Sequence, residues 1–206
     1  MLNTITKAFS AAPVCYSLIA VITVVSIWAI KVQRVFLQLL LYPYSIFNSR
    51  EHYRLFTGDL VHNDPVHLFI NLMLLFTFGT RLEEYLITQT VIGSLNFLLV
   101  YGSSCLAGSL VTSIRHRKEE DFMNVGASGS IIGCMLGYVL LQPNIIAFYV
   151  PVLGGIKNIF GGLICIVAFM IFQFRSNRGN INHEVHFFGG LGGIAATYFI
   201  HYCGSS

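Results

Sequence analysis

Val125-Gly126-Ala127-Ser128-Gly129-Ser130 joins two parts of the chain that differ sharply in composition. Residues 115–121 before it are rich in charge, whereas residues 122–156 contain no charged side chain. Glycines let backbone segments approach closely, and a helix amino end offers free N–H donors to a developing oxyanion. Ser128 at this junction is therefore a candidate nucleophile, although Gly, Ala and Ser are also common packing residues between membrane helices.

The whole chain has the composition of an integral membrane protein. Of its 206 residues, 10% are charged and 55% are hydrophobic, and the mean hydropathy is +0.70. A water-soluble fold of this size could not cover so large an apolar fraction. The net charge of +3 gives no support for binding nucleic acid. The cysteines lie singly in apolar segments without metal-binding spacing, so we expect free thiols.

The hydrophobic pattern predicts an all-α polytopic membrane protein with six transmembrane helices in a single domain, residues 1–206. Residues 32–62 mix aromatic and basic side chains, which predicts an interfacial loop with short helices. Residues 143–156 are expected to form an apolar loop or a re-entrant segment. The expected helices cover about 13–31, 64–80, 87–113, 128–142, 156–174 and 182–202.

Two glycine stripes predict which helices meet. The last helix carries His186 near its start, on the same face as its glycines. Small residues at this spacing let two membrane helices pack with their backbones nearly in contact. Such packing would hold Ser128 beside His186, which is the best candidate for its base. The stripes are Gly129 and Gly133 in the fourth helix, and Gly189 and Gly193 in the sixth.

His67 and Asn71 place further polar groups near the start of the second helix, on one face. The second, fourth and sixth helices cross the membrane in the same direction, so their starts share one side. Polar groups within a span usually face protein or water, and a helix–helix hydrogen bond is the alternative explanation. We expect an oxyanion hole formed by Asn71, His67, Ser128 and Gly126.

No carboxylate is well placed to complete a triad, so the sequence predicts a Ser128/His186 dyad. The aspartates lie outside the predicted spans, and Glu184 is off the face of its helix that carries His186. A zinc site at His62, His67 and His186 lacks a carboxylate or cysteine ligand. No metal or organic cofactor is expected.

These residues together resemble the rhomboid family of intramembrane serine proteases. The resemblance spans residues 50–193 and rests on several motifs at family spacing. They are Tyr53-Arg54, His62-x4-His67-x3-Asn71, Glu83, Gly126-Ala127-Ser128-Gly129 and His186-x2-Gly189-x3-Gly193. The resemblance implies a six-helix rhomboid-like bundle, with Ser128 as nucleophile and His186 as base. It also implies structural positions near the site, at Arg54, His62, Glu83, Gly129, Gly133, Gly189, Gly193 and Ile132.

Ile132 departs from the family pattern, which usually has Phe or Tyr beneath the histidine. The main expectation is an endopeptidase that cleaves transmembrane helices of membrane proteins, in contact with membrane lipid. The alternative is a weak or inactive relative that only binds transmembrane helices. A transporter would need broken helices with paired charges at mid-membrane, which this chain lacks.

The distribution of basic residues bears on orientation. Most of them lie in loops on the candidate site's side of the membrane, which by the positive-inside rule would face the cytoplasm. The family's usual bacterial arrangement has a cytoplasmic amino terminus and a site that opens outward. The resemblance implies this second arrangement, in a bacterial plasma membrane. The sequence gives no indication of the oligomeric state.

Overall fold

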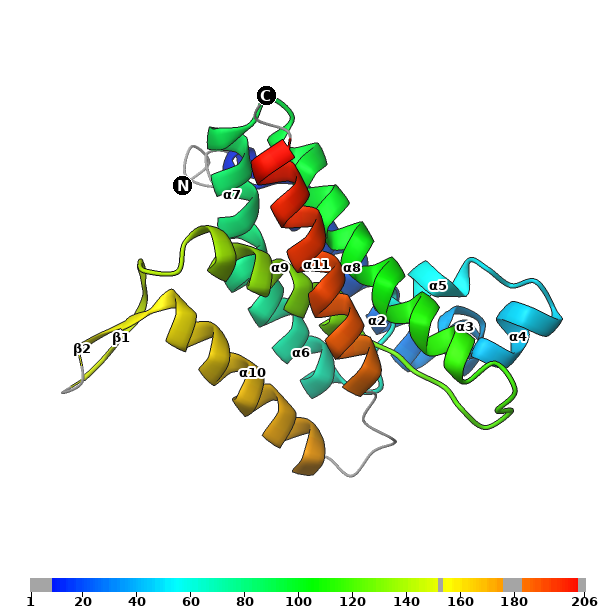
Figure 1. Ribbon diagram of the computed structural model, residues 1–206. Helices are drawn as coiled ribbons and strands as arrows, with labels where there is room; N and C mark the ends of the chain where they lie inside the picture. Colours follow the sequence, from blue (N-terminus) through cyan, green and yellow to red (C-terminus); the bar gives the residue numbers. More distant parts are fainter. Residues whose placement is uncertain (1–8, 152–153, 176–182, 204–206) are drawn as a thin grey trace.

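The computed structural model describes residues 9–151, 154–175 and 183–203. This part of the chain is mostly helical, with one two-stranded hairpin (Figure 1). The elements are α2 (Pro13–Lys31), α3 (Gln33–Leu39), α4 (Pro43–Asn48), α5 (Arg54–Thr57), η1 (Gly58–Leu60), α6 (Pro65–Leu74), η2 (Leu75–Gly79), α7 (Thr80–Gln89), α8 (Gly93–Arg115), α9 (Ser128–Leu141), β1 (Ile146–Val150), β2 (Gly154–Lys157), α10 (Asn158–Arg175) and α11 (His183–Cys203).

Three helices in the described residues are long and apolar enough to cross a membrane. They are α2, the continuous helix Pro65–Gln89 and α8. Large apolar side chains such as Trp28, Phe69 and Leu99 are exposed on these helices, as expected for surfaces that face lipid. The chain is therefore an integral membrane protein. Six spans remain a prediction, since α9 and the apolar part of α10 are shorter.

The second helix is longer than expected. The sequence predicted an end near residue 80, but α6, the π-helical η2 and α7 form one helix as far as Gln89. The prediction was wrong because Arg81 and Glu83 were taken to mark the membrane boundary. Arg81 is exposed, and the Glu83 carboxylate is buried against another helix, so neither ends this one. The third helix, α8, accordingly begins at Gly93 and not near 87.

The segment expected as an apolar loop or re-entrant segment contains a β-hairpin. Strands β1 and β2 pair antiparallel, and Gly154, the first residue of β2, adopts a φ of +82°, which favours glycine. Asn158 closes the hairpin base, because its backbone N–H donates to Ile145 O at 2.8 Å and its side-chain Nδ2 donates to Gln142 O at 3.0 Å. The hairpin thus connects α9 to α10 (Figure 1).

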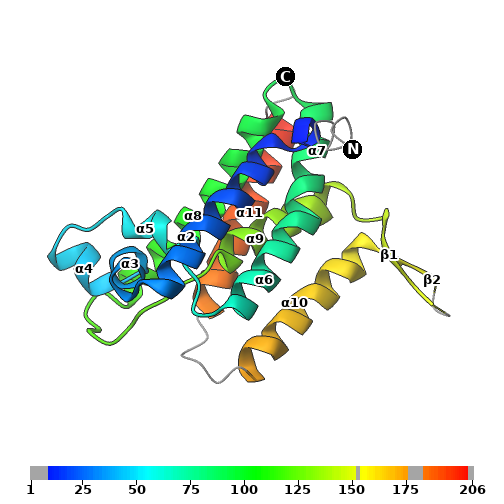
Figure 2. The ribbon, with the colours of Figure 1, turned by 180° about the vertical axis from the view of Figure 1, so that it is seen from behind.

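Helices α8, α9 and α11 form the centre of the bundle. Helix α11 packs along both α8 and α9, whereas α10 lies on the outside with the hairpin (Figures 1 and 2). The predicted interfacial segment forms α3, α4, α5 and η1. Helices α3, α4 and α5 lie beside the bundle (Figure 2). Helices α9, α10 and α11 lie within two residues of their predicted bounds; the predicted start of the last helix, residue 182, is outside the described residues.

The core of the bundle is filled by large apolar side chains from several helices. Leu75, Leu82, Phe97, Ile131 and Met135 are almost completely buried. The cysteines whose state the structure describes are free thiols, as the sequence predicted: Cys15, Cys105, Cys134 and Cys165. The amino ends of α9 and α11 meet at one end of this core, and the candidate site lies there.

Candidate active site

Ser128 and His186 are in direct contact. Ser128 is the first residue of α9 and is buried, and His186 is in the first turn of α11. Ser128 Oγ lies 2.7 Å from His186 Nε2, although the two residues are 58 positions apart in sequence. A neutral imidazole at this distance can accept the hydroxyl proton, which is the geometry that an activated serine requires.

Glycines bring the two helices together. A methyl group at Gly189 would lie 2.7 Å from Gly129 O, and one at Gly193 would lie 2.5 Å from Gly133 C. Any side chain at these positions would therefore meet the backbone of the facing helix. The close approach predicted from the two glycine stripes is therefore present. It sets the distance between α9 and α11 near their amino ends, where Ser128 and His186 lie.

The second helix brings His67 beside the loop before Ser128, and Asn71 follows one turn further along that helix. Its N-cap, Asp64, accepts hydrogen bonds from the N–H groups of Val66 and His67, each at 2.9 Å. Asn71 is buried, and its Nδ2 donates to His67 O at 2.9 Å. The His67 ring lies against Gly126, because a methyl group there would be 2.8 Å from His67 Cε1. His67 thus lines the segment that leads into Ser128.

Gly126 has a conformation that explains its identity. Its φ is +106°, in the region that residues with a side chain rarely adopt. Its N–H donates to Gly58 O at 2.9 Å, which ties the loop before α9 to η1. Both the backbone conformation and the nearby His67 ring therefore require glycine at this position.

His62 connects the interfacial segment to the amino end of α9. Its Nε2 accepts from Ala127 N–H at 3.5 Å, and its Nδ1 lies 2.9 Å from Ser26 Oγ. Ser26 Oγ donates to Leu60 O at 2.7 Å, so Nδ1 carries the imidazole proton and donates to Ser26. Burial, and secondarily His67, lower the pKa of His62 to about 3. His62 is therefore neutral and fully hydrogen-bonded.

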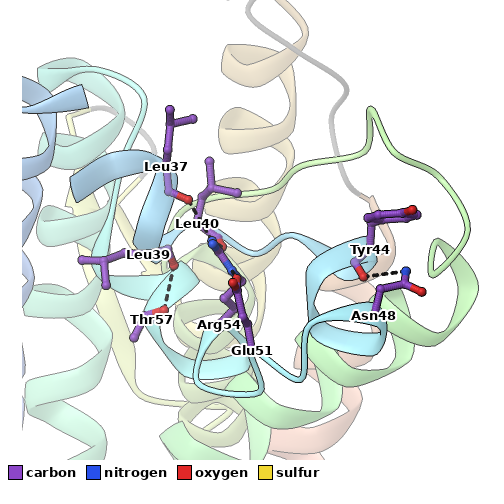
Figure 3. A network of polar contacts seen from close by, with 8 residues as sticks. All are labelled: Leu37, Leu39, Leu40, Tyr44, Asn48, Glu51, Arg54 and Thr57. Carbon is purple, nitrogen blue, oxygen red and sulfur yellow. Dashed lines mark hydrogen bonds and ion pairs between the residues drawn. The ribbon is translucent and has the colours of Figure 1, made fainter. Parts of the chain in front are cut away.

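Arg54 organises the interfacial segment (Figure 3). Its Nη1 donates to Leu37 O and to Leu40 O, each at 2.9 Å, and its Nε is paired with Glu51. Thr57 Oγ1 donates to another carbonyl of the same stretch, Leu39 O, at 2.7 Å. These bonds cap the end of α3 and fix the chain where it turns toward η1.

Glu83 lies away from the pair, although the sequence grouped it with residues near the site. It follows Asn71 by twelve residues, which is about 18 Å along a helix. Its carboxylate accepts from Val14 N–H at 3.0 Å and Cys15 N–H at 2.7 Å. Glu83 therefore caps the amino end of α2 and joins it to α7 at the far end of the bundle.

Ile132 occupies the position one turn after Ser128. It is buried, and its Cγ2 would be 3.5 Å from a methyl group at Gly190, one turn after His186. The aliphatic side chain therefore lies against α11 next to the turn that carries the histidine. It supports the helix by van der Waals contact, where an aromatic residue would offer a ring face.

Glu184 points toward α8. Its carboxylate is 2.9 Å from Arg115 Nε and 3.2 Å from His116 Nε2. His116 also contacts Glu119 at 2.9 Å, which links the start of α11 to the charged loop. These partners are consistent with the expectation that Glu184 does not serve as the third member of a triad.

Ser130 of α9 and Asp59 of η1 form a contact that the sequence did not predict. Ser130 Oγ donates a hydrogen bond to Asp59 Oδ2 of η1, and both residues are buried. The two positions are 71 residues apart, and nothing in one sequence indicates that they pair. Among the described residues, no group of His, Cys, Asp or Glu side chains is arranged to hold a metal ion.

The fold and this site define a polytopic helical membrane protein with a serine–histidine pair enclosed between its helices. Residues 49–203 match the family model described as "Rhomboid domain". The chain belongs to the rhomboid family.

Curated relatives agree with this assignment. "Putative rhomboid protease YdcA" of Bacillus subtilis is 32% identical over 148 residues, which cover 72% of this chain and 67% of the relative. "Rhomboid protein 1, mitochondrial" of Saccharomyces cerevisiae is 28% identical over 145 residues, 68% of this chain and 39% of the relative. "Rhomboid protease GluP" of Bacillus subtilis is 29% identical over 155 residues, 74% of this chain but 27% of the relative. The chain thus spans well under half the length of the last two.

Proposed function

We propose that this protein is an intramembrane serine endopeptidase that cleaves transmembrane helices of other membrane proteins. The observation that carries the proposal is the 2.7 Å contact between Ser128 Oγ and His186 Nε2 in a member of the rhomboid family. A serine hydroxyl is a weak nucleophile until a base accepts its proton, and His186 is within reach to do so. No metal or organic cofactor takes part in the proposed reaction.

In the first half of the reaction, Ser128 Oγ attacks the scissile carbonyl carbon while His186 Nε2 takes the hydroxyl proton. The tetrahedral intermediate collapses, the peptide C–N bond breaks, and His186 donates that proton to the leaving amine. The product is an acyl-enzyme ester on Ser128. The carboxyl-terminal half of the substrate leaves with a new amino terminus.

The oxyanion formed in this step requires hydrogen-bond donors. The candidates are the Ser128 N–H, the side chain of His67 and the Asn71 amide, with Gly126 giving the substrate backbone room to approach. Helix α9 has no side-chain cap at Ala127, so the N–H groups of its first turn are available to a ligand. The Asn71 amide, which donates to His67 O, would turn toward the substrate oxygen.

In the second half, His186 removes a proton from a water molecule that attacks the ester carbonyl. Ser128 regains its proton from His186 as the C–O bond to the enzyme breaks, and the new carboxyl terminus is released. A transmembrane substrate must lose local helical hydrogen bonds before it can be attacked. We therefore expect cleavage where a substrate helix unwinds easily near the membrane surface.

We also propose that the protein has the six-span architecture expected from the sequence. A single membrane domain over residues 1–206 with six spans would combine the three long spans with α9, α10 and α11. The match to bacterial relatives supports a bacterial plasma membrane as its location. The interfacial segment would lie at the membrane surface beside the site, where unwound substrate would enter.

A second candidate function is binding of transmembrane helices without cleavage. Ile132 favours it, because an aliphatic residue replaces the aromatic ring expected beneath the histidine. The Ser128–His186 hydrogen bond favours the enzyme, since a binding protein has no need of a serine hydroxyl aligned with an imidazole. The two candidates differ in one measurable property, the reactivity of Ser128.

Labelling of the membrane-reconstituted protein by a fluorescent fluorophosphonate probe tests this property. We expect the wild type to label and the variants Ser128→Ala and His186→Ala to lose labelling and cleavage of a transmembrane test substrate. Ser109→Ala is the matched control, because Ser109 is as buried as Ser128, at 5% exposure each, and only donates to Cys105 O within its own helix. A folded wild type that binds a transmembrane peptide but never labels would support the non-enzymatic candidate.

A further inference from the structure

One interfacial segment holds the chain on both sides of Ser128. Before the serine, Gly126 N–H donates to Gly58 O at 2.9 Å. After it, Ser130 Oγ donates to the carboxylate of Asp59, the next residue of η1. Ser128 is therefore placed between two hydrogen bonds to adjacent residues of η1.

Asp59 is an unusual residue for this position. It is buried, and Tyr101 and Cys105 of α8 and Cys134 of α9 also face its carboxyl group. Among the ion pairs of the described residues, none includes Asp59. A buried carboxyl group without a cationic partner destabilises a fold, whereas a well-packed apolar residue of similar size would not.

The Asp59 carboxylate is a strong hydrogen-bond acceptor for the Ser130 hydroxyl. An ionised carboxylate only accepts hydrogen bonds, and a hydroxyl that donates to a charged acceptor forms a shorter and stronger bond than one between neutral groups. Ser130 is in the first turn of α9, where the helix has no side-chain cap. A strong bond at this point fixes the turn from which Ser128 projects.

We infer that Asp59 is a positioning residue for the nucleophile, which holds the first turn of α9 through Ser130 so that Ser128 Oγ stays aligned with His186 Nε2. This inference rests on the proposed function, because it takes Ser128 as the nucleophile. Asp59 does not touch the reacting atoms. Its effect passes through one helical turn of backbone.

The charge of Asp59 makes the alignment of Ser128 depend on pH. Burial raises the pKa of Asp59 to about 6, against the lowering effect of the Ser130 hydrogen bond. The phenol and thiol groups that face it are ordinarily neutral at that pH, and His62 in the same segment is neutral above about pH 3. Asp59 therefore loses its charge as the pH falls through 6. The bond to Ser130 then becomes an ordinary neutral one, and the alignment of Ser128 weakens.

Three variants of the full chain in proteoliposomes test the role. Asp59→Leu keeps the approximate size but removes the acceptor, Ser130→Ala removes the donor, and Asp59→Asn keeps an acceptor oxygen that cannot ionise. Asp121→Asn, at an exposed aspartate of the loop before α9, is the control. For each variant, the initial rate of fluorophosphonate labelling and the kcat and KM for a transmembrane test substrate are measured between pH 5 and 8.

We expect Asp59→Leu and Ser130→Ala to lower kcat and the labelling rate by at least about tenfold at pH 7.5, with little change in KM. A fourth variant that combines Asp59→Leu with Ser130→Ala should be no slower than the slower of these two single variants, because both changes remove the same bond. Asp59→Asn should show the lowered rate of the low-pH wild type at every pH from 5 to 8, because its acceptor is always neutral, and it should lack the fall in kcat near pH 6. A purely structural role would reduce the folded fraction without removing this pH-dependent step.

The measurements distinguish failure of the Asp59 role from failure of the proposed protease activity. If the wild type is active and both Ser130→Ala and Asp59→Leu react at the wild-type rate, the inference is wrong and the proposed function stands. The same holds if the kcat of Asp59→Asn falls near pH 6 as the wild-type kcat does. If Asp59→Leu fails to fold, the Ser130→Ala and Asp59→Asn profiles decide the question. A folded wild type that neither labels nor cleaves contradicts the proposed function, and the inference with it.

Discussion

Gly189 of α11 and Gly129 of α9 approach so closely that a methyl group on Gly189 would lie 2.7 Å from the Gly129 carbonyl oxygen. Gly129 directly follows Ser128, and Gly189 lies about one turn after His186, so the helix separation that this contact permits also sets the distance between those two side chains. Backbone cannot yield to an added methyl group as a flexible side chain can. The two helices would have to move apart.

Gly189→Ala should therefore destabilise the protein by about 1–3 kcal/mol, as overpacking does elsewhere, and slow fluorophosphonate labelling by more than about tenfold. Thermal denaturation in detergent and the labelling rate measure the two effects. Gly102→Ala in α8 is the matched control, because nothing lies within 4 Å of a methyl group there. A Gly189→Ala variant as stable and as reactive as Gly102→Ala would contradict the packing argument.

Arg54→Lys should loosen the interfacial segment despite keeping the charge. The guanidinium donates to Leu37 O, Leu40 O and Glu51 from one planar group, whereas an ammonium group cannot meet all three in this geometry. Loss of one bond to a charged donor should cost about 1.5–3 kcal/mol. The rate of proteolysis within residues 32–62 is the measurement, and Arg50→Lys at an exposed arginine is the control. Equal proteolysis of both variants would be evidence against this role.

Glu83→Gln should lower stability with a smaller effect on the chemistry at Ser128. The carboxylate accepts from two N–H groups at the start of α2, at 3.0 and 2.7 Å, and an amide has only one acceptor oxygen. We expect a loss of about 1–2 kcal/mol, the typical value of a helix cap. Glu84→Gln is the control, because Glu84 is exposed. If the folded Glu83 variant labelled more than tenfold slower, Glu83 would have a role in the site.

His62 should make the protein less stable as the pH falls. Its pKa is lowered from 6.5 to about 3 in the folded state, so between these values the unfolded chain binds a proton that the folded protein does not. This difference removes about 2 kcal/mol of stability between pH 7 and pH 5. Comparing the stability of wild type and His62→Gln at both pH values isolates the contribution, with His52→Gln at an exposed histidine as control. An unchanged pH slope in His62→Gln would show that His62 is not responsible.

The sequence predicted the parts of this fold that depend on regular spacing. Glycines four residues apart predicted the contact of α9 with α11, because a small-residue stripe is a property of one helix face. Long uncharged runs likewise predicted α2 and α8. Charge was a poorer guide, since Arg81 and Glu83 were read as the end of a helix that continues to Gln89.

The sequence could not predict the contacts that depend on three-dimensional packing. Asp59 was noted only as an aspartate outside the spans, and its bond to Ser130 depends on η1 reaching the first turn of α9. Glu83 was assigned near the site because its motif spacing gives order along the chain and not position across the membrane. The hairpin after α9 was missed because a short apolar run does not distinguish strand from loop.

The π-helical segment η2 explains how the second helix keeps one side buried. Asn71, Leu75, Gly79 and Glu83 are all buried and follow one another in steps of four. In a regular α-helix each such step overshoots a full turn by about 40°, so Glu83 would point about 120° away from Asn71. A π-helical turn holds more residues and cancels much of this rotation. Deletion of the exposed Thr77 should therefore turn this segment into a regular α-helix in which Glu83 follows Asn71 by eleven residues, about 20° from the same face, so its carboxylate would still point toward the start of α2.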